Sequence, residues 1–267
     1  MQKGLEYQFA LIKKLAEQNK VEVMTLGESG RWFLSQYVMT PSGSLTALSD
    51  WHDAGHKSIW YYSRHYRVNL FWEKGEVRIR DMYIFDDTYE EKYIQERCKT
   101  HACEFRNLPI MDGVLYTNSE SARAAGIYFK AGEEILKWEN LNYLEEEGCS
   151  EVHLTAGNHR AIIYLSETKM EVVSNIAELK LEAVYDEQKV FGMNRDEESR
   201  FTNANNNSTV ITYVTEVDIQ ENQMKFVFDG QEYGLLAEKG HFEGTSLCSD
   251  NGSISIKVVQ GGTNGTV

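Results

Sequence analysis

The sequence predicts a mainly β protein: a large antiparallel β-sandwich with an N-terminal helix–strand lead-in and one short internal helix. Three observations lead to this fold class. From Ser44 onward, short runs of β-branched and aromatic residues are separated by frequent turn signals. Asp229-Gly230 is the strongest hairpin signal in the chain. A chain of 267 residues with 12% aromatic residues can also bury a sizeable core without disulfides.

Residues 1–40 are expected to form the lead-in, packed on the main domain. Apolar residues recur there at helical spacing, which predicts an amphipathic helix through Leu5, Phe9, Ile12 and Leu15. Val21–Leu26 reads as a short strand, and Gly27–Gly30 as a loop. Residues 41–260 are assigned to the β-sandwich domain, and residues 261–267 to a disordered tail.

The stretch from Ser58 to Asp87 predicts a hairpin around Lys74-Gly75, because glycine accepts the positive φ of a tight turn. The expected pairs on the apolar face are Trp72 with Val77, Leu70 with Ile79, and Tyr66 with Tyr83. The opposite face carries Arg67, Asn69, Phe71, Arg78 and Arg80. In this register Asp81 lands on the apolar face, opposite Val68.

The other expected strands follow the same alternation of apolar and polar residues. They are Ser44–Leu48, Glu104–Leu108, Gly113–Tyr116, Gly126–Phe129, Ile135–Leu144, Glu151–Thr155, Arg160–Leu165, Lys169–Ser174, Leu181–Tyr185, Thr209–Val217, Met224–Phe228, Gln231–Leu236 and Ser253–Val259. Two tight loops set further pairs: Phe226 with Tyr233 and Met224 with Leu235 around Asp229-Gly230, and a hairpin at residues 156–159. Thr88 with Glu91 forms a capping box that predicts a helix over about residues 89–98. Residues 194–208 read as a polar loop.

Charge and cysteine content narrow the functional classes. The formal net charge of -14 argues against nucleic acid and against an anionic membrane as partners. Four cysteines without a disulfide spacing pattern are expected to be reduced thiols. No signal peptide and no membrane-spanning run is visible, so the expected location is cytoplasmic.

Two polar groupings are candidate sites. Asp50, Trp51, His52 and Asp53, with His56 close behind, make either a ligand-contacting loop, a metal site or a plain polar turn. Asp81 is the second, since a carboxylate on an apolar face costs several kcal/mol unless it is paired. Asp81 either takes part in catalysis or sugar binding, or has a structural explanation. In the second case it forms an ion pair with a nearby arginine, or a β-bulge turns its side chain outward.

Aromatic residues suggest the ligand class. Aromatic faces stack on the C–H faces of sugars, while Asp, Asn and Arg side chains bind the hydroxyl groups. The same residues at strand spacing also serve as core, so we expect about two or three of the eight to reach a ligand. The set is Trp51, Trp60, Tyr61, Tyr62, Tyr66, Trp72, Tyr83 and Trp138.

Two smaller groupings carry weaker signals. Cys98, His101 and Cys103 offer three possible ligands but no standard zinc spacing. His241 with Glu243 is a possible acid–base pair in a glycine-flanked loop. We therefore expect no metal and no cofactor. Walker, dinucleotide-binding, nucleophile-elbow and H-E-x-x-H motifs are absent from the sequence, which lowers the weight of phosphoryl transfer, hydride transfer and serine hydrolysis.

The run TLGESGRWF at residues 25–33, followed by Thr40-Pro41, resembles the last strand and exit loop of a deacetylase-like or glycosidase-like (β/α) barrel. Some bacterial carbohydrate-active proteins continue from such a barrel into a β-rich C-terminal domain. The resemblance covers about the first forty residues and carries over no catalytic residue. It implies that the chain is the C-terminal part of a larger enzyme, or a relative without the barrel.

Three functions remain open. The first is a carbohydrate-recognising domain, accessory to or derived from a glycan-active enzyme, in which Asp50, Trp51, His52, Trp60, Tyr62, Arg67 and Arg80 contact the ligand. The second is a glycoside hydrolase, which needs paired carboxylates about 5–10 Å apart; Asp81 with Asp53 or Glu243 would supply them. The third is a structural or assembly domain without a ligand. The expected partners are a carbohydrate and either a second copy of the chain or a barrel catalytic domain.

Overall fold

The computed structural model describes residues 2–50, 52–88, 92–97, 99, 108–146, 148–187, 190, 201–202, 208–209, 214–228 and 230–261. The chain divides into two compact units, Met1–Thr40 and Pro41–Val267. Trp51, Cys98, His101 and Cys103 lie outside the described residues. So do most of the expected polar loop at 194–208 and all but the first residue of the expected tail. No helix in the described residues is long and apolar enough to cross a membrane.

The first unit is helical throughout its regular structure. The N-terminal helix is confirmed as α1 (Gln2–Glu17). The strand expected at Val21–Leu26 and the loop at Gly27–Gly30 are wrong, because residues 21–25 form no strand and α2 (Leu26–Gln36) follows them. A capping box begins α2: the Thr25 hydroxyl accepts the Glu28 N–H, and the Glu28 carboxylate accepts the Thr25 N–H at 2.8 Å. These reciprocal bonds satisfy the free N–H groups that open a helix.

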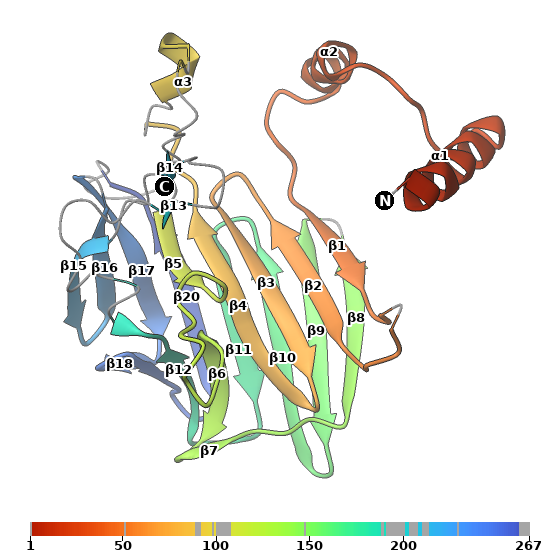
Figure 1. Cartoon of the computed structure of the whole chain (residues 1–267). Helices are drawn as coiled ribbons and strands as arrows, with labels where there is room; N and C mark the ends of the chain where they lie inside the picture. The colour runs from red at the N-terminus through yellow and green to blue at the C-terminus, as the bar shows by residue number, and fades with distance from the viewer. Residues whose placement is uncertain are drawn as a thin grey trace. The chain divides into compact units, whose positions relative to one another are not determined.

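The second unit contains two large antiparallel sheets, as Figure 1 shows. The ten-stranded sheet, here called sheet A, has the order β1-β2-β3-β4-β6-β12-β19-β18, with β5 paired to β4 and β7 paired to β6. Its strands are β1 (Gly43–Ala47), β2 (Lys57–Tyr62), β3 (Tyr66–Glu73), β4 (Glu76–Ile84), β5 (Leu108–Asp112), β6 (Gly126–Ala131), β7 (Glu134–Ile135), β12 (Leu179–Val184), β18 (His241–Glu243) and β19 (Ser246–Cys248).

The eight-stranded sheet, here called sheet B, has the order β15-β16-β17-β20-β11-β10-β9-β8. Its strands are β8 (Asn140–Glu146), β9 (Cys149–Ala156), β10 (His159–Ser166), β11 (Lys169–Ser174), β15 (Val214–Gln220), β16 (Gln223–Phe228), β17 (Gln231–Lys239) and β20 (Ser253–Val259). Two short strands, β13 (Phe201–Thr202) and β14 (Ser208–Thr209), pair with each other, and the helix α3 (Lys92–Gln95) follows β4 in the chain.

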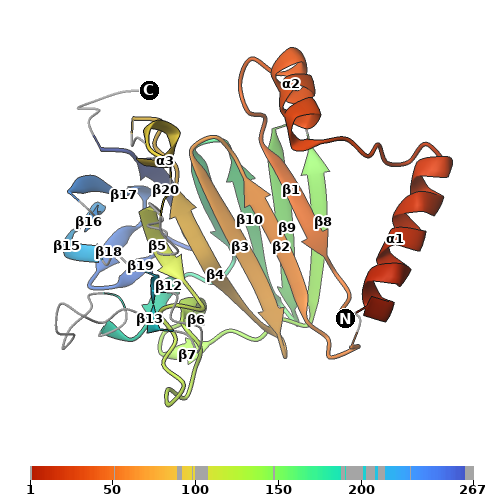
Figure 2. The same cartoon turned by 45° about the horizontal axis from the view of Figure 1, so that its top comes forward.

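The two sheets face each other and bury one face of each, which confirms the mainly β sandwich (Figure 2). Alternate residues of each strand point into the core because side chains alternate across a strand. On β3 the core residues are Tyr66, Val68, Leu70 and Trp72. Sheet B contributes residues such as Ile163 on β10 to the same core. The face of sheet A away from sheet B is called its outer face below.

The β3–β4 hairpin confirms two of the three expected pairs and corrects the third. Trp72 pairs with Val77 and Leu70 with Ile79 around Lys74-Gly75. A β-bulge then inserts an extra residue in β4, so that Tyr66 pairs with Ile84 rather than with Tyr83. The prediction that Asp81 stands on the apolar face opposite Val68 is therefore wrong. A bulge reverses the alternation that follows it, which puts Asp81 beside Asn69 on the outer face.

Most other strands form where the sequence predicts them, including the pairs Phe226–Tyr233 and Met224–Leu235. Two expectations are wrong: residues 113–116 form a turn after β5, and residues 136–139 interrupt the strand expected at Ile135–Leu144. The strands β18 and β19 were not predicted, and the strand expected at Glu104–Leu108 lies outside the described residues except for Leu108. The helix expected at 89–98 is described only over its middle, as the single turn of α3.

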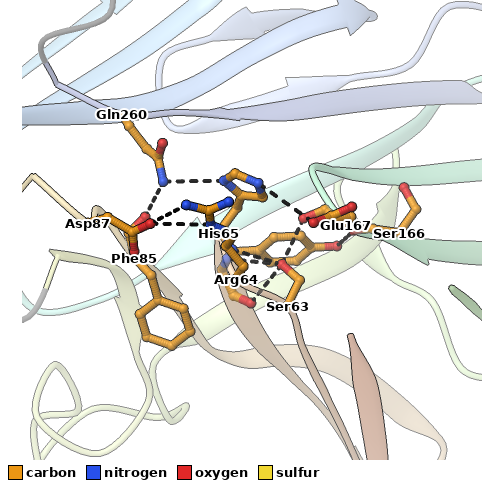
Figure 3. A network of polar contacts seen from close by, with 9 residues as sticks. Ser63, Arg64, His65, Phe85, Asp87, Ser166, Glu167 and Gln260 are labelled. Atoms are coloured by element: carbon orange, nitrogen blue, oxygen red, sulfur yellow. Dashed lines mark hydrogen bonds and ion pairs between the residues drawn. The ribbon is translucent and has the colours of Figure 1, made fainter. Parts of the chain in front are cut away.

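Polar contacts join the two sheets where the β2–β3 turn meets the β10–β11 turn, as Figure 3 shows. The Ser63 hydroxyl donates to the Glu167 carbonyl at 2.7 Å. The buried Tyr66 hydroxyl lies 2.7 Å from the Lys169 carbonyl, and His65 Nε2 lies 3.9 Å from a Glu167 carboxylate oxygen. Because these groups come from opposite sheets, the network fixes the sheets against each other at this end of the sandwich.

Candidate functional site

The outer face of sheet A carries alternating arginine and aromatic side chains on four neighbouring strands. We call this surface the Arg–aromatic platform. It consists of Trp60 on β2, Arg67 and Phe71 on β3, Arg78, Arg80 and Tyr83 on β4, and Tyr128 on β6. The sequence assigned Trp60, Arg67 and Arg80 to a ligand site, and the structure brings these three together.

Each guanidinium of the platform lies over two rings. Arg67 lies 4.5 Å from the Tyr83 ring centre and 5.8 Å from that of Trp60. Arg80 lies 5.9 Å from Trp60 and 4.8 Å from Phe71. Arg78 continues the series between Phe71 and Tyr128, at 5.0 and 6.0 Å. All six distances are within the ~6 Å over which a cation is attracted to an aromatic face. These ring contacts therefore help to hold the three arginines in place on the outer face.

Two glycines make room for the arginine stems. A Cβ at Gly113 would lie 2.5 Å from Cγ of Arg80, and a Cβ at Gly126 would lie 2.7 Å from Cδ of Arg78. Any larger residue would push these stems off the sheet. The arrangement of the platform thus depends on residues that carry no side chain themselves.

The carboxylates near the platform are already engaged. Asp81 accepts from Arg80 Nε at 2.9 Å, and both residues are largely buried. Asp112, on β5, accepts the hydroxyl of Tyr83 and the N–H groups of Val114 and Leu115. Burial, together with the Asp112 carboxylate, raises the pKa of Tyr83 well above that of a free tyrosine. Asp81 is therefore an ion-paired acid, the alternative that the sequence left open.

Arg67 differs from its neighbours in charge balance. Among the described residues, Arg78 pairs with Glu73 and Arg80 with Asp81, and no ion pair engages Arg67. Its Nε is buried without a hydrogen-bond partner in the described part of the chain, as is Oδ1 of Asn69, its neighbour on the outer face. Buried polar atoms without partners are costly, and Arg78 Nε is another such atom on the platform among the described residues.

The loop before β2 uses Asp50 to hold its own backbone. The Asp50 carboxylate accepts the N–H groups of His52, Ala54 and His56 at 3.0, 3.0 and 2.7 Å. The hydrogen bonds from Ala54 and His56 lower the pKa of Asp50. Asp53 is exposed at the tip of this loop with a positive φ of 54°. The structure thus gives Asp50 a structural use, and it does not describe Trp51.

The second acid pair proposed for hydrolysis, Asp81 with Glu243, lies far apart on sheet A. Glu243 lies on β18, four strand spacings from β4, which at ~4.8 Å each is ~19 Å along the sheet. Hydrolysis of a glycosidic bond needs the two carboxyl groups within roughly 10 Å of each other.

The aromatic residues divide between core and surface. Tyr61, Tyr66, Trp72 and Trp138 are buried, and Tyr61, Tyr66 and Trp72 belong to the core face of sheet A. Trp60 and Tyr62 lie on the outer face, and Tyr62 is 45% exposed beside Gly43 on β1. Trp60 and Tyr62 are thus the two ligand-binding aromatics predicted from the sequence that the structure places on an accessible surface.

A second candidate site is an apolar cleft between the sheets, with a volume of about 730 Å³ including its open mouth. Its lining includes Met170, Tyr185, Phe226 and Phe242, with Thr245 among the few polar residues. Such a lining offers almost nothing to orient a polar ligand. The platform, rather than the cleft, has the groups that recognise hydroxyls and charge.

Comparison with known proteins gives no family. No family model and no curated protein matches the chain. YidC from Thermotoga maritima is similar in structure, with 10% identity, a TM-score of 0.43, and coverage of 84% of this chain and 51% of that chain. A YidC insertase with its first transmembrane domain resolved gives 11% identity, a TM-score of 0.44, and coverage of 87% and 43%. A glycoside hydrolase of family 81 from Clostridium thermocellum gives 8% identity, a TM-score of 0.30, and coverage of 75% and 21%.

These likenesses do not bear on the activity of the chain. All three TM-scores are below 0.5, and this chain spans about half or less of each similar protein. The similarity to a glycoside hydrolase is weak and distant. The argument for function therefore depends on the platform itself.

Proposed function

We propose that the Arg–aromatic platform binds carbohydrate. The observation that carries the proposal is the half-buried Trp60 ring, which lies between two guanidinium groups at 5.8 and 5.9 Å on the outer face of sheet A. A sugar that stacks on Trp60 presents its hydroxyl groups to both arginines. An apolar platform with a few convergent polar groups is the usual composition of such a site.

Arg67 indicates which sugars bind best. It is the platform arginine without an ion pair among the described residues, so its charge is not neutralised locally. A guanidinium binds a carboxylate through two parallel hydrogen bonds. The net charge of -14 opposes an anionic ligand only weakly, because charges more than ~8 Å from the ligand are largely screened at physiological salt. The preferred ligand is therefore a saccharide that carries a carboxylate, such as a uronic acid.

Binding without cleavage fits the acids on this face. Asp81 is held by Arg80, and Asp112 by Tyr83 and two backbone N–H groups. A general acid must hold a proton and a general base must be free to take one, and these pairings favour neither. The proposal is accordingly recognition, with hydrolysis as the outcome that the experiment also tests.

The test is calorimetric titration of the full chain with two sets of oligosaccharides, one neutral and one rich in uronic acid. We expect the uronate set to bind more tightly. Trp60→Ala should weaken binding by about five- to twelvefold, since a stacked aromatic contributes about 1–1.5 kcal/mol. Arg67→Ala should remove the preference for uronates. Tyr164→Ala is the matched control, because this half-buried tyrosine belongs to β10 of sheet B.

Two results would contradict the proposal. One is that neither set binds the unmodified chain. The other is that Trp60→Ala and Arg67→Ala bind as well as Tyr164→Ala does, which would place any sugar site elsewhere. Release of reducing sugar during the titration would replace recognition with hydrolysis.

A further inference from the structure

The hairpin at the edge of sheet A gathers three side chains that can bind a metal. The strands β18 and β19 pair directly, with His241 opposite Cys248 and Glu243 opposite Ser246. His241 and Glu243 are two residues apart on one strand and therefore share a face. The pairing adds Cys248 to the same outer face, because opposite residues of an antiparallel pair point to the same side. Phe242 and Leu247 point into the core instead.

The spacing of the donor atoms suits a tetrahedral ion. His241 Nε2 lies 3.3 Å from Glu243 Oε1, and Cys248 Sγ lies 3.6 Å from Glu243 Oε2. The three donor groups all lie within 4.8 Å of one another. Zinc binds nitrogen and oxygen at about 2.0–2.1 Å and sulfur at about 2.3 Å, so tetrahedral geometry puts a nitrogen and an oxygen ligand about 3.3 Å apart and a sulfur and an oxygen ligand about 3.6 Å apart. The His241 and Cys248 donors thus each match the expected spacing to one oxygen of the Glu243 carboxylate, and they lie within 4.8 Å of each other.

Asp250 provides the outer contact that metal-binding histidines commonly have. Its Oδ1 lies 3.9 Å from His241 Nδ1, and its Oδ2 accepts the Gly240 N–H at 2.8 Å. At 3.9 Å this contact is longer than a hydrogen bond; if it closes to hydrogen-bond distance, the carboxylate would fix the tautomer in which Nε2 is free to bind a metal. Lys180 pairs with Cys248 across the strands, and its Nζ forms an ion pair with Glu133 Oε1 at 2.8 Å. The charge of Lys180 is therefore balanced.

We propose that His241 Nε2, the Glu243 carboxylate and Cys248 Sγ bind a divalent transition metal of the zinc class, with a fourth position open to solvent. A thiolate with an imidazole selects zinc-like ions over magnesium and calcium, which prefer oxygen ligands alone. Three protein ligands with one open position is the pattern of sites that bind a water or a further ligand. The net charge of -14 also raises the local concentration of cations.

A second group of cysteine, histidine and glutamate residues lacks the close ligand spacing of the β18–β19 hairpin. On β9, His153 Nε2 lies 2.7 Å from Glu151, and Cys149 precedes both residues on the same face. Cys149 is four residues from His153 along one strand, which is ~13 Å. The third ligand at the β18–β19 hairpin comes instead from the opposite strand, where the distance between paired residues is ~5 Å.

The experiment is titration of the chelator-treated full chain with Zn²⁺, followed by Co²⁺ as a spectroscopic probe. We expect one equivalent of Zn²⁺ to bind, and a thiolate-to-metal charge-transfer band with Co²⁺. Cys248→Ser should abolish this band. His241→Ala should weaken Zn²⁺ binding by more than about a hundredfold, since loss of an outer contact alone costs about 10–100-fold. Asp250→Asn should show that smaller loss.

Two controls keep the test decisive. The double variant Cys149→Ser, His153→Ala should bind Zn²⁺ as the unmodified chain does. The triple variant Cys98→Ser, His101→Ala, Cys103→Ser should also keep the band. Unchanged binding in folded Cys248→Ser, loss of the band in either control, or no stoichiometric Zn²⁺ binding by the unmodified chain would each overturn the proposal. Circular dichroism of every variant verifies that it folds.

Discussion

Replacing Tyr83 by phenylalanine tests the support beneath the platform. The Tyr83 ring stacks on the Arg67 guanidinium at 4.5 Å, and its hydroxyl donates to the Asp112 carboxylate. Tyr83 and Asp112 are only 6% and 8% exposed. Phenylalanine keeps the ring and removes the hydroxyl, so one buried carboxylate oxygen loses its donor. A hydrogen bond to a charged group contributes about 1.5–3 kcal/mol, and that is the expected loss in free energy of unfolding.

Urea unfolding followed by tryptophan fluorescence measures this loss. With a slope of about 2–3 kcal/mol per molar urea for a chain of this size, the midpoint should fall by roughly 0.5–1.5 M at unchanged slope. Tyr62→Phe is the matched control, because Tyr62 is on the same outer face and 45% exposed; it should change the midpoint very little. If Tyr83→Phe matched Tyr62→Phe, the buried pairing with Asp112 would contribute nothing and our reasoning would be refuted.

Three further predictions concern the fold. Gly234→Ala should lower the free energy of unfolding in urea by about 2–4 kcal/mol, because the new Cβ would clash with the Met224 carbonyl oxygen on the paired strand. A loss below about 1 kcal/mol would contradict this close packing. Thr25→Ala should destabilise α2 by about 1 kcal/mol, seen as faster amide hydrogen exchange over residues 26–36, and unchanged exchange would argue against the cap. Burial raises the pKa of Tyr61 to about 12 and also raises that of Tyr66 well above its ordinary value, which is about 10 in the unfolded chain. The stability that the neutral phenols contribute is fully present below pH ~10 and is lost as the pH rises toward ~12. The midpoint of urea unfolding should therefore stay constant from about pH 8 to 10 and fall above pH ~10. An unchanged midpoint at about pH 11 would contradict this prediction.

The sequence predicted the sandwich well because strand alternation and tight turns are local signals. The hairpins around Lys74-Gly75 and at residues 156–159 formed as expected, since their loops fix the register. The β-bulge at Arg80–Asp81 has no such signal. An acid in an apolar run reads equally well as a buried site or as an extra residue, and only the partner strand decides between them.

The candidate site was predicted in part, for the same reason. Arg67 and Arg80 were named because strand alternation puts them on the polar face, and Trp60 because its ring could stack on a sugar; the structure places all three on the outer face. Phe71 and Tyr128 complete the platform, yet Tyr128 comes from a strand more than forty residues away in the chain. Cys248 was also missed, because β18 and β19 have three residues each and three residues show too little alternation to predict a strand. The capping box at Thr25 and Glu28, in contrast, was visible in the sequence and overlooked.

The position of β20 has a consequence for how the molecule assembles. This strand is the last of the described strands along the chain, yet it lies in the interior of sheet B, between β17 and β11. Until β20 pairs, the other seven strands of sheet B form two separate ribbons, of three and four strands, whose inner edges have unpaired N–H and C=O groups. Completion of sheet B therefore depends on pairing between strands that are far apart in the sequence, which slows folding. Until that pairing forms, the unpaired strand edges can associate with other chains.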